Sequence, residues 1–147
     1  MGYFSSGRLL PFVTKKSGIA VTVGTIADVF SVTGGSVRIT SFFGKVATLI
    51  GAGAATLQWS ADVAGTDSAL CAVSASIANS VAGRIFTVVG PIATAMLLGT
   101  GEGGSTDMTT PQIVNTCTLD LIVAVGTTGT VDWYITWMPI DAGAQVV

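Results

Sequence analysis

The stretch Thr130-Val131-Asp132-Trp133-Tyr134-Ile135-Thr136-Trp137-Met138 alternates between apolar and more polar positions. Val131, Trp133, Ile135 and Trp137 fall on one face of this stretch when it is extended. A period of two is typical of a β-strand with one buried face. We therefore predict a half-buried strand over 130–138, in which Trp133 and Trp137 are core residues.

The segment immediately before this strand shows the same alternation. Leu119, Leu121, Val123 and Val125 are spaced two residues apart, and Gly126-Thr127-Thr128-Gly129 follows them. Gly and Thr in such a short connection are typical of a turn. The sequence therefore predicts a β-hairpin made of residues 119–125 and 130–138.

Shorter β-type runs, separated by glycines, fill the rest of the chain. They cover 19–23, 26–32, 36–43, 55–61, 70–76, 84–89 and 92–98. Nineteen glycines suit frequent tight turns and disfavour long helices. We predict an all-β fold, either an antiparallel β-sandwich or a jelly-roll-like barrel, with about eight to nine strands. Residues 46–55 are expected to form a loop or bulged strand, and 99–111 an exposed loop.

Residues 1–17 lack sustained alternation and are predicted to form an extended N-terminal arm, followed by a single β-sandwich domain over 18–147. The arm combines aromatic and basic side chains without an acid, a composition that suits docking onto a protein partner. Its candidate interaction residues are Tyr3, Phe4, Arg8, Phe12, Lys15 and Lys16. Binding of single-stranded nucleic acid by the same residues is less favoured, because three positive charges are few and the net charge is −2.

The chain is short of charge for a protein that exposes its whole surface to water. Six basic and eight acidic side chains make up 10% of the sequence, and half of its residues are hydrophobic. Designed soluble surfaces carry about 25 to 35% charged residues. Residues 85–101 have no charge but contain Gly90-Pro91, which opposes a spanning helix. We predict no membrane partner or secretion signal, and expect other protein to cover much of the surface.

Residues for catalysis are scarce. Histidine is absent, which removes the commonest general base and metal ligand. Asp62 with Asp67, and Glu102 with Asp107, are the nearest acidic pairs, and their turn-like surroundings favour structural roles. Cys71 and Cys117 are predicted to be buried, unpaired thiols. We expect no cofactor, no metal and no enzymatic activity.

Two segments resemble a group of small virion proteins of tailed bacteriophages. Residues 129–144 end in Met138-Pro139-Ile140-Asp141-Ala142-Gly143-Ala144, which is similar to the closing segment of these proteins. Residues 57–62 and 65–71 are similar to their pattern of a strand, a Gly/Thr loop with Asp, and a strand that carries Cys. The resemblance covers roughly 19–144, and it does not extend to the predicted arm.

This resemblance implies a β-sandwich or jelly-roll-like capsid decoration protein, also called a cement protein. The implied partners are the major capsid protein and further copies of the chain, with a homotrimer preferred. The implied location is the capsid surface of the virion, after assembly in the cytoplasm of a bacterial host. Two alternatives remain open: a tail or head-fibre component that binds host glycan through Trp59 or Tyr134, and a hydrolase that uses Asp62 and Asp67.

Overall fold

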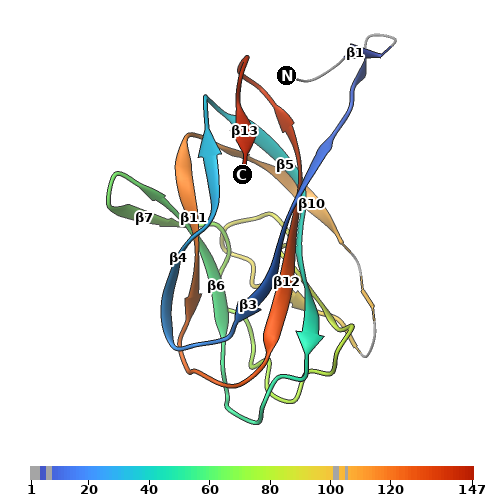
Figure 1. Cartoon of the computed structure of the whole chain (residues 1–147), viewed down its shortest axis with the longest axis vertical. Coiled ribbons are helices and arrows are strands. Elements are labelled where there is room, and N and C mark those ends of the chain that lie inside the picture. The colour runs from blue at the N-terminus through green and yellow to red at the C-terminus, as the bar shows by residue number, and fades with distance from the viewer. Residues whose placement is uncertain (1–3, 6–7, 101–102, 105) are drawn as a thin grey trace.

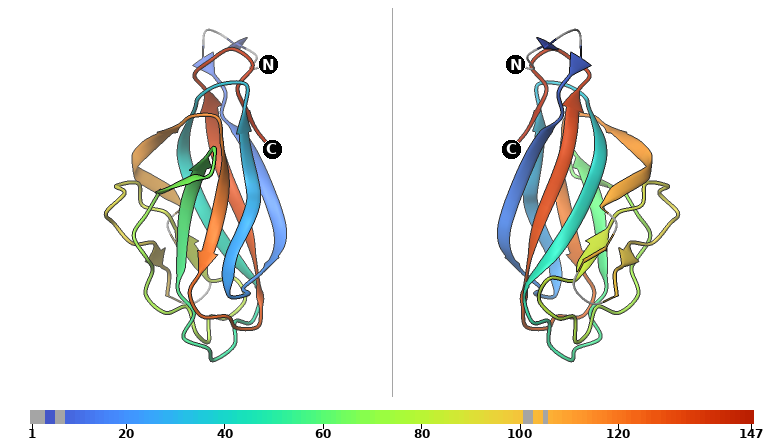
Figure 2. Two further views of the ribbon diagram at one scale, coloured as in Figure 1. Left: turned by 90° about the vertical axis from the view of Figure 1, so that its left-hand side faces the viewer. Right: turned by 90° about the vertical axis from the view of Figure 1, so that its right-hand side faces the viewer.

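The computed structural model describes residues 4–5, 8–100, 103–104 and 106–147, with the backbone alone at residues 4, 5, 8 and 9. These residues form thirteen β-strands and no helix. Most strands run along the long axis of the molecule, and loops close its two ends (Figures 1 and 2). The prediction of an all-β fold is confirmed.

Two antiparallel sheets make up the sandwich. Sheet I contains, in spatial order, β3 (Phe12–Ala20), β12 (Thr130–Pro139), β5 (Val37–Thr48), β8 (Ile85–Thr87) and β9 (Leu97–Leu98), and β10 (Asp107–Val114) also pairs with β5. Sheet II contains β13 (Gln145–Val146), β4 (Gly24–Thr33), β11 (Cys117–Val123), β6 (Leu57–Val63) and β7 (Thr66–Ala69). A separate pair, β1 (Phe4–Ser5) and β2 (Arg8–Leu9), precedes them.

The pairing of the long strands is nested. Strand β3 pairs with β12, β4 with β11, β5 with β10 and β6 with β7, all antiparallel. The strands therefore form one long antiparallel pair of chain segments, which turns back at the β6–β7 hairpin. This long pair is folded over so that β3–β12 and β5–β10 lie in sheet I, whereas β4–β11 and β6–β7 lie in sheet II. This arrangement is a jelly roll, an architecture shared by viral capsid and lectin domains.

Aromatic side chains fill the space between the two sheets. Trp59 from sheet II meets Trp133 from sheet I edge to face, with ring centroids 4.9 Å apart, and Phe42 lies 4.6 Å from Trp59. Trp59 and Trp133 are fully buried, and Trp137 is 6% exposed. The predicted core positions of Trp133 and Trp137 are confirmed.

The predicted hairpin between residues 119–125 and 130–138 is wrong. Strand β11 pairs with β4 and β6 in sheet II, whereas β12 pairs with β3 and β5 in sheet I. Residues 124–129 therefore connect sheet II to sheet I. Within this connection, the Thr128 carbonyl accepts a hydrogen bond from Gly51 N–H at 3.1 Å. The sequence could not distinguish the two arrangements. A hairpin and a connection between sheets use the same turn residues, and β11 and β12 each have one buried face in both.

Further predictions fail along the chain. Residues 21–23 of the predicted strand 19–23 connect β3 to β4, and only Leu97–Leu98 of the predicted strand 92–98 is a strand. Residues 70–76 form no strand, and only an isolated bridge joins Ala72 to Ala95. The expected loop over 99–111 gives way at Asp107 to strand β10, whose register against β5 shifts between Asp107 and Gln112. Pro111 lies within this irregular stretch, where the missing amide proton of proline is tolerated at a bulge.

The predicted arm is shorter than residues 1–17. Residues 12–17 are the first part of strand β3, which pairs with β12 from Phe12 opposite Trp137 to Ala20 opposite Thr130. The sequence of β3 does not alternate between apolar and polar residues, because Lys16 lies on the same face of the strand as Phe12. A lysine at a sheet edge can lay its aliphatic stem along the core and keep its ammonium group in water.

Candidate protein-interaction surfaces

The N-terminal hairpin projects beyond the sandwich. Strands β1 and β2 pair through Phe4 opposite Leu9 and Ser5 opposite Arg8, and Figures 1 and 2 show them past the end of both sheets. Tyr3 and the side chains of Phe4 and Arg8 lie outside the described residues. Their proposed contacts with a partner stay a prediction.

The other three predicted arm residues belong to the sandwich. Phe12 stacks on Trp137 with ring centroids 4.9 Å apart, which extends the core to the edge of sheet I. Lys15 forms an ion pair with Asp132 at 3.1 Å. Lys16 is half-buried beside β12. The contacts of Phe12 and Lys15 hold β3 against β12, and docking of Phe12, Lys15 and Lys16 onto a partner stays a prediction.

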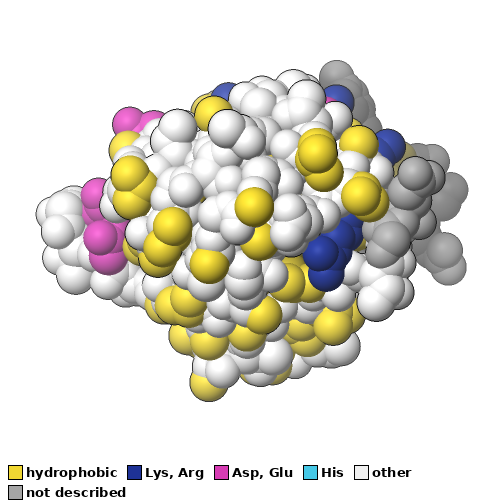
Figure 3. All heavy atoms as spheres, turned by 90° about the horizontal axis from the view of Figure 1, so that it is seen from below, with side chains coloured by type: hydrophobic (Ala, Val, Ile, Leu, Met, Phe, Trp, Pro, Cys, Tyr) yellow, Lys and Arg dark blue, Asp and Glu magenta, His cyan; other side chains and the backbone are white. Residues whose placement is uncertain are grey.

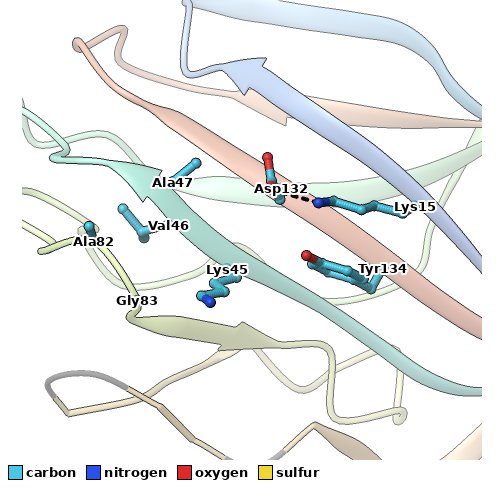
Figure 4. Close-up of a pocket in the computed structure, with 8 residues that line it drawn as sticks. All are labelled: Lys15, Lys45, Val46, Ala47, Ala82, Gly83, Asp132 and Tyr134. Carbon is cyan, nitrogen blue, oxygen red and sulfur yellow. Dashed lines mark ion pairs between the residues drawn. The ribbon is translucent and has the colours of Figure 1, made fainter.

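A groove of about 470 Å³ lies on the outer face of sheet I (Figure 4). Lys15, Asp132 and Tyr134 line one side, and Lys45 lies on the neighbouring strand β5. The Tyr134 side chain and then Asp132 raise the pKa of Lys15. The Gly18 N–H, 2.8 Å from Asp132 Oδ1, and then Lys15 lower the pKa of Asp132. The groove therefore holds a charged pair and an additional cation.

Neither aromatic residue named for glycan binding offers a free ring face. Trp59 is fully buried in the core, so its role as a glycan platform is wrong. One face of Tyr134 stacks on Phe43, with centroids 4.9 Å apart and planes 9° from parallel. Lys15 Nζ lies over the Tyr134 ring, 5.2 Å from its centre. A sugar could stack on Tyr134 only after one of these neighbours moved.

Three carboxylates gather on sheet II. Atoms of Asp62, Asp67 and Asp120 that could ligate a metal lie within 4.8 Å of one another, a donor set of the type that Ca²⁺ prefers. Asp62 also accepts a hydrogen bond from Gly65 N–H at 2.7 Å, and the buried Asp120 accepts one from Asp28 N–H at 2.8 Å. These bonds close the β6–β7 turn and a bulge in β4, which gives both residues a structural role. Glu102 lies outside the described residues.

Both cysteines are buried and free, as predicted. Burial raises the pKa of Cys71, and burial with the nearby Asp120 and Asp62 raises the pKa of Cys117 to about 11. Each side chain is therefore a thiol at neutral pH. The thiolate is the reactive form of cysteine, so this environment opposes nucleophilic chemistry.

The end of the sandwich opposite the N-terminal hairpin is built from uncharged loops. Four charge-free segments reach this end: 17–27, 46–61, 68–83 and 121–131. Backbone hydrogen bonds tie them together, from Val21 N–H to the Gly129 carbonyl at 3.2 Å and from Ile50 N–H to the Ser80 carbonyl at 3.0 Å. We call this surface, made by loops 21–23, 49–56, 78–83 and 124–129, the uncharged end.

Hydrophobic side chains project from every part of the uncharged end. Those that are exposed are Val23, Leu49, Val81 and Val125. Figure 3 looks onto this end and shows hydrophobic side chains scattered across it, acidic side chains mainly at its left edge, and Lys and Arg side chains on the same face. The charge-free segments can be read from the sequence, but only the fold shows that four of them meet at one end of the sandwich. Sequence reasoning missed this surface.

No family model, curated protein or solved structure matches this chain. Among the described residues, no helix is long and apolar enough to cross a membrane.

Proposed function

We propose that the chain is a non-enzymatic virion structural protein, which decorates the head of a tailed bacteriophage and binds across neighbouring major capsid subunits. The observation that carries the proposal is the uncharged end, because loops that contain no charged residue and expose aliphatic side chains suit burial against protein. The similarity of residues 57–71 and 129–144 to phage virion proteins supports the same function. The jelly-roll architecture agrees with it only by analogy, since one fold serves many functions.

The proposed mechanism is stabilisation by mass action. A protein that binds the assembled shell but not free capsid subunits shifts the equilibrium toward the shell. At a free concentration one hundred times its dissociation constant, each bound copy contributes about 2.7 kcal/mol. The decoration protein would act at the outer capsid surface as a homo-oligomer, preferably a trimer, after assembly in the bacterial cytoplasm. This role needs no cofactor, nucleic acid or membrane.

A quantitative gel of purified virions, with heads and tails separated, tests this proposal. A decoration protein is expected in the head fraction at a copy number comparable to that of the major capsid protein. A tail or fibre component that binds glycan would appear at few copies in the tail fraction. Absence from purified particles would overturn the virion assignment.

The hydrolase alternative has its own test. Asp62 and Asp67 face each other across the β6–β7 hairpin, so an enzyme that used this pair would lose activity in an Asp67→Asn variant. We expect this variant to protect purified heads against heat as well as the wild-type protein does. Loss of a hydrolytic activity in the variant would contradict the proposed non-enzymatic role.

A further inference from the structure

The two sheets of the sandwich carry net charges of opposite sign. The strands of sheet II contain no basic residue and four acidic ones, Asp28, Asp62, Asp67 and Asp120. The strands of sheet I contain two acidic residues, Asp107 and Asp132, and four basic ones, Lys15, Lys16, Arg38 and Lys45. The net charge is therefore −4 on sheet II and +2 on sheet I, a separation that the total of −2 does not reveal.

The acidic charge of sheet II is most accessible on the β6–β7 hairpin. This hairpin extends sideways from the sandwich in Figure 1, and every residue of β7 is exposed. Asp62 and Asp67 pair across its two strands, and an oxygen of each carboxylate lies within 4.8 Å of the other. Two negative charges this close attract a cation more strongly than either does alone. The single ion pair among the described residues joins Lys15 to Asp132, so the hairpin has no cation of its own.

The groove on the outer face of sheet I offers a matching cation. Lys45 is exposed and lies opposite Asp132 in the pairing of β5 with β12, but Asp132 Oδ2 contacts Lys15 Nζ at 3.1 Å. Figure 4 shows the Lys45 ammonium group turned away from Asp132. The neighbouring wall consists of small residues, namely Ala47, Ala82 and Gly83. An exposed turn can therefore bring a carboxylate against Lys45.

We infer that the chain associates head to tail with a second copy, whose acidic β6–β7 hairpin binds in the groove of sheet I. The charges of the two surfaces are complementary, and both surfaces are present on every copy. A hairpin in a groove buries little area, so the contact belongs to the weak class below about 1,200 Å². Because the two surfaces differ, each bound copy still offers one of them, and further copies add into a closed ring or an open row.

Self-association of this kind goes beyond the proposed function and does not rest on it, because both surfaces belong to the isolated chain. The uncharged end takes no part in the contact. A chain that stayed monomeric could still be found in the head fraction of purified virions, and a self-associating chain could be absent from it. The two experiments therefore fail independently.

The first experiment measures sedimentation of the full-length chain from about 10 to 500 µM in about 50 mM salt. We expect the wild type to associate, and Lys45→Glu and Asp67→Lys each to associate about tenfold more weakly, because like charges would then meet. Charge reversal is needed, since Asp67→Asn leaves the Asp62 carboxylate to bind Lys45. Raising the salt to about 500 mM should weaken the wild-type contact as well, because salt screens exposed charges.

The matched controls are Arg38→Glu and Asp107→Lys. They make the same changes in charge at exposed positions of sheet I that line neither the groove nor the hairpin. We expect both controls to associate like the wild type. If a reversal at the contact does not fold, Ala47→Glu replaces Lys45→Glu in the groove, and Thr66→Lys replaces Asp67→Lys on the hairpin, because both positions are exposed.

A mixing experiment tests whether the hairpin and the groove meet each other. Lys45→Glu keeps an intact acidic hairpin, and Asp67→Lys keeps an intact basic groove. We expect association to recover when the two variants are mixed, because each contact between unlike copies then joins opposite charges. A monomeric wild type at low salt, equal weakening in the controls, or no recovery on mixing would each overturn the inference. Lower occupancy of Lys45→Glu on particles, with a monomeric wild type, would assign the groove to an acidic surface of another protein instead.

Discussion

The two ends of the sandwich differ in charge although one continuous core joins them. The end that bears the N-terminal hairpin also carries Arg38 and Asp141, and Asp141 Oδ2 accepts a hydrogen bond from Ser36 N–H at 2.7 Å. The opposite end is formed by loops 21–23, 49–56, 78–83 and 124–129, which contain no charge. The low charge of the chain is therefore unevenly distributed over its surface. A charged end suits steering and specific pairing, whereas an uncharged end suits permanent burial.

The largest effect is expected from the core that both ends share. Replacing Trp133 with Ala should lower the free energy of unfolding by about 3 to 5 kcal/mol, because a fully buried ring that contacts Trp59 and Phe42 would be lost. Chemical denaturation of the variant measures this change, and Thr136→Ala on the outer face of the same strand is the control. A Trp133→Ala protein as stable as the control would show that the two ends do not depend on a common core.

The next effect tests how tightly the uncharged end is built. Gly129 has φ of +107°, and a Cβ added there would lie 2.6 Å from the Leu49 carbonyl oxygen. Gly129→Ala should therefore destabilise the protein by more than the roughly 1 to 3 kcal/mol expected from backbone strain alone. Gly65→Ala is the matched control, because Gly65 has φ of +83° and open space around its Cβ position. Equal losses of stability in the two variants would argue against close packing of these loops.

A smaller effect is expected from Asp132, at the rim of the uncharged end. The folded-state pKa of Asp132 lies below the ordinary value of 3.8, first because of the Gly18 N–H and then because of Lys15. The resulting stability is present above the unfolded pKa and disappears as the pH falls through the folded pKa. Asp132→Asn should therefore lower the thermal midpoint at pH 7 but not at pH values well below 3.8. Asp67→Asn is the control, and a deficit in Asp132→Asn that is independent of pH would exclude this linkage.

The smallest change in stability is expected at the N-terminal hairpin. Deleting residues 1–9 leaves β3 intact, so the free energy of unfolding should change by less than about 0.5 kcal/mol. Occupancy on particles should fall, and the loss should depend on salt, if this segment docks onto the capsid. A longer deletion to Lys16 removes more than half of β3 and serves as the destabilised control. Full occupancy of the shorter chain across a salt series would assign capsid binding to the sandwich itself.

The sequence alone determined the fold class and the buried face of its clearest strand. Alternating side chains place Trp133 and Trp137 inside whichever sheet contains β12, because the period of a strand does not depend on its partner. The same alternation could not identify that partner. Residues 126–129 can reverse the chain within one sheet or cross to the other, and this choice depends on contacts with Gly51 and Val21, which are distant in sequence.

The candidate surface shows the same division between local and long-range information. The sequence determines that segments 17–27, 46–61, 68–83 and 121–131 are free of charge, because charge is a property of single residues. Only the tertiary structure decides that loops from all four meet at one end, through backbone bonds such as Val21 to Gly129 and Ile50 to Ser80. It likewise decides that Phe12 packs on Trp137 and that Tyr134 lies between Phe43 and Lys15. A surface is created by neighbours in space, and the rolled ribbon of the jelly roll brings together residues that the sequence keeps far apart.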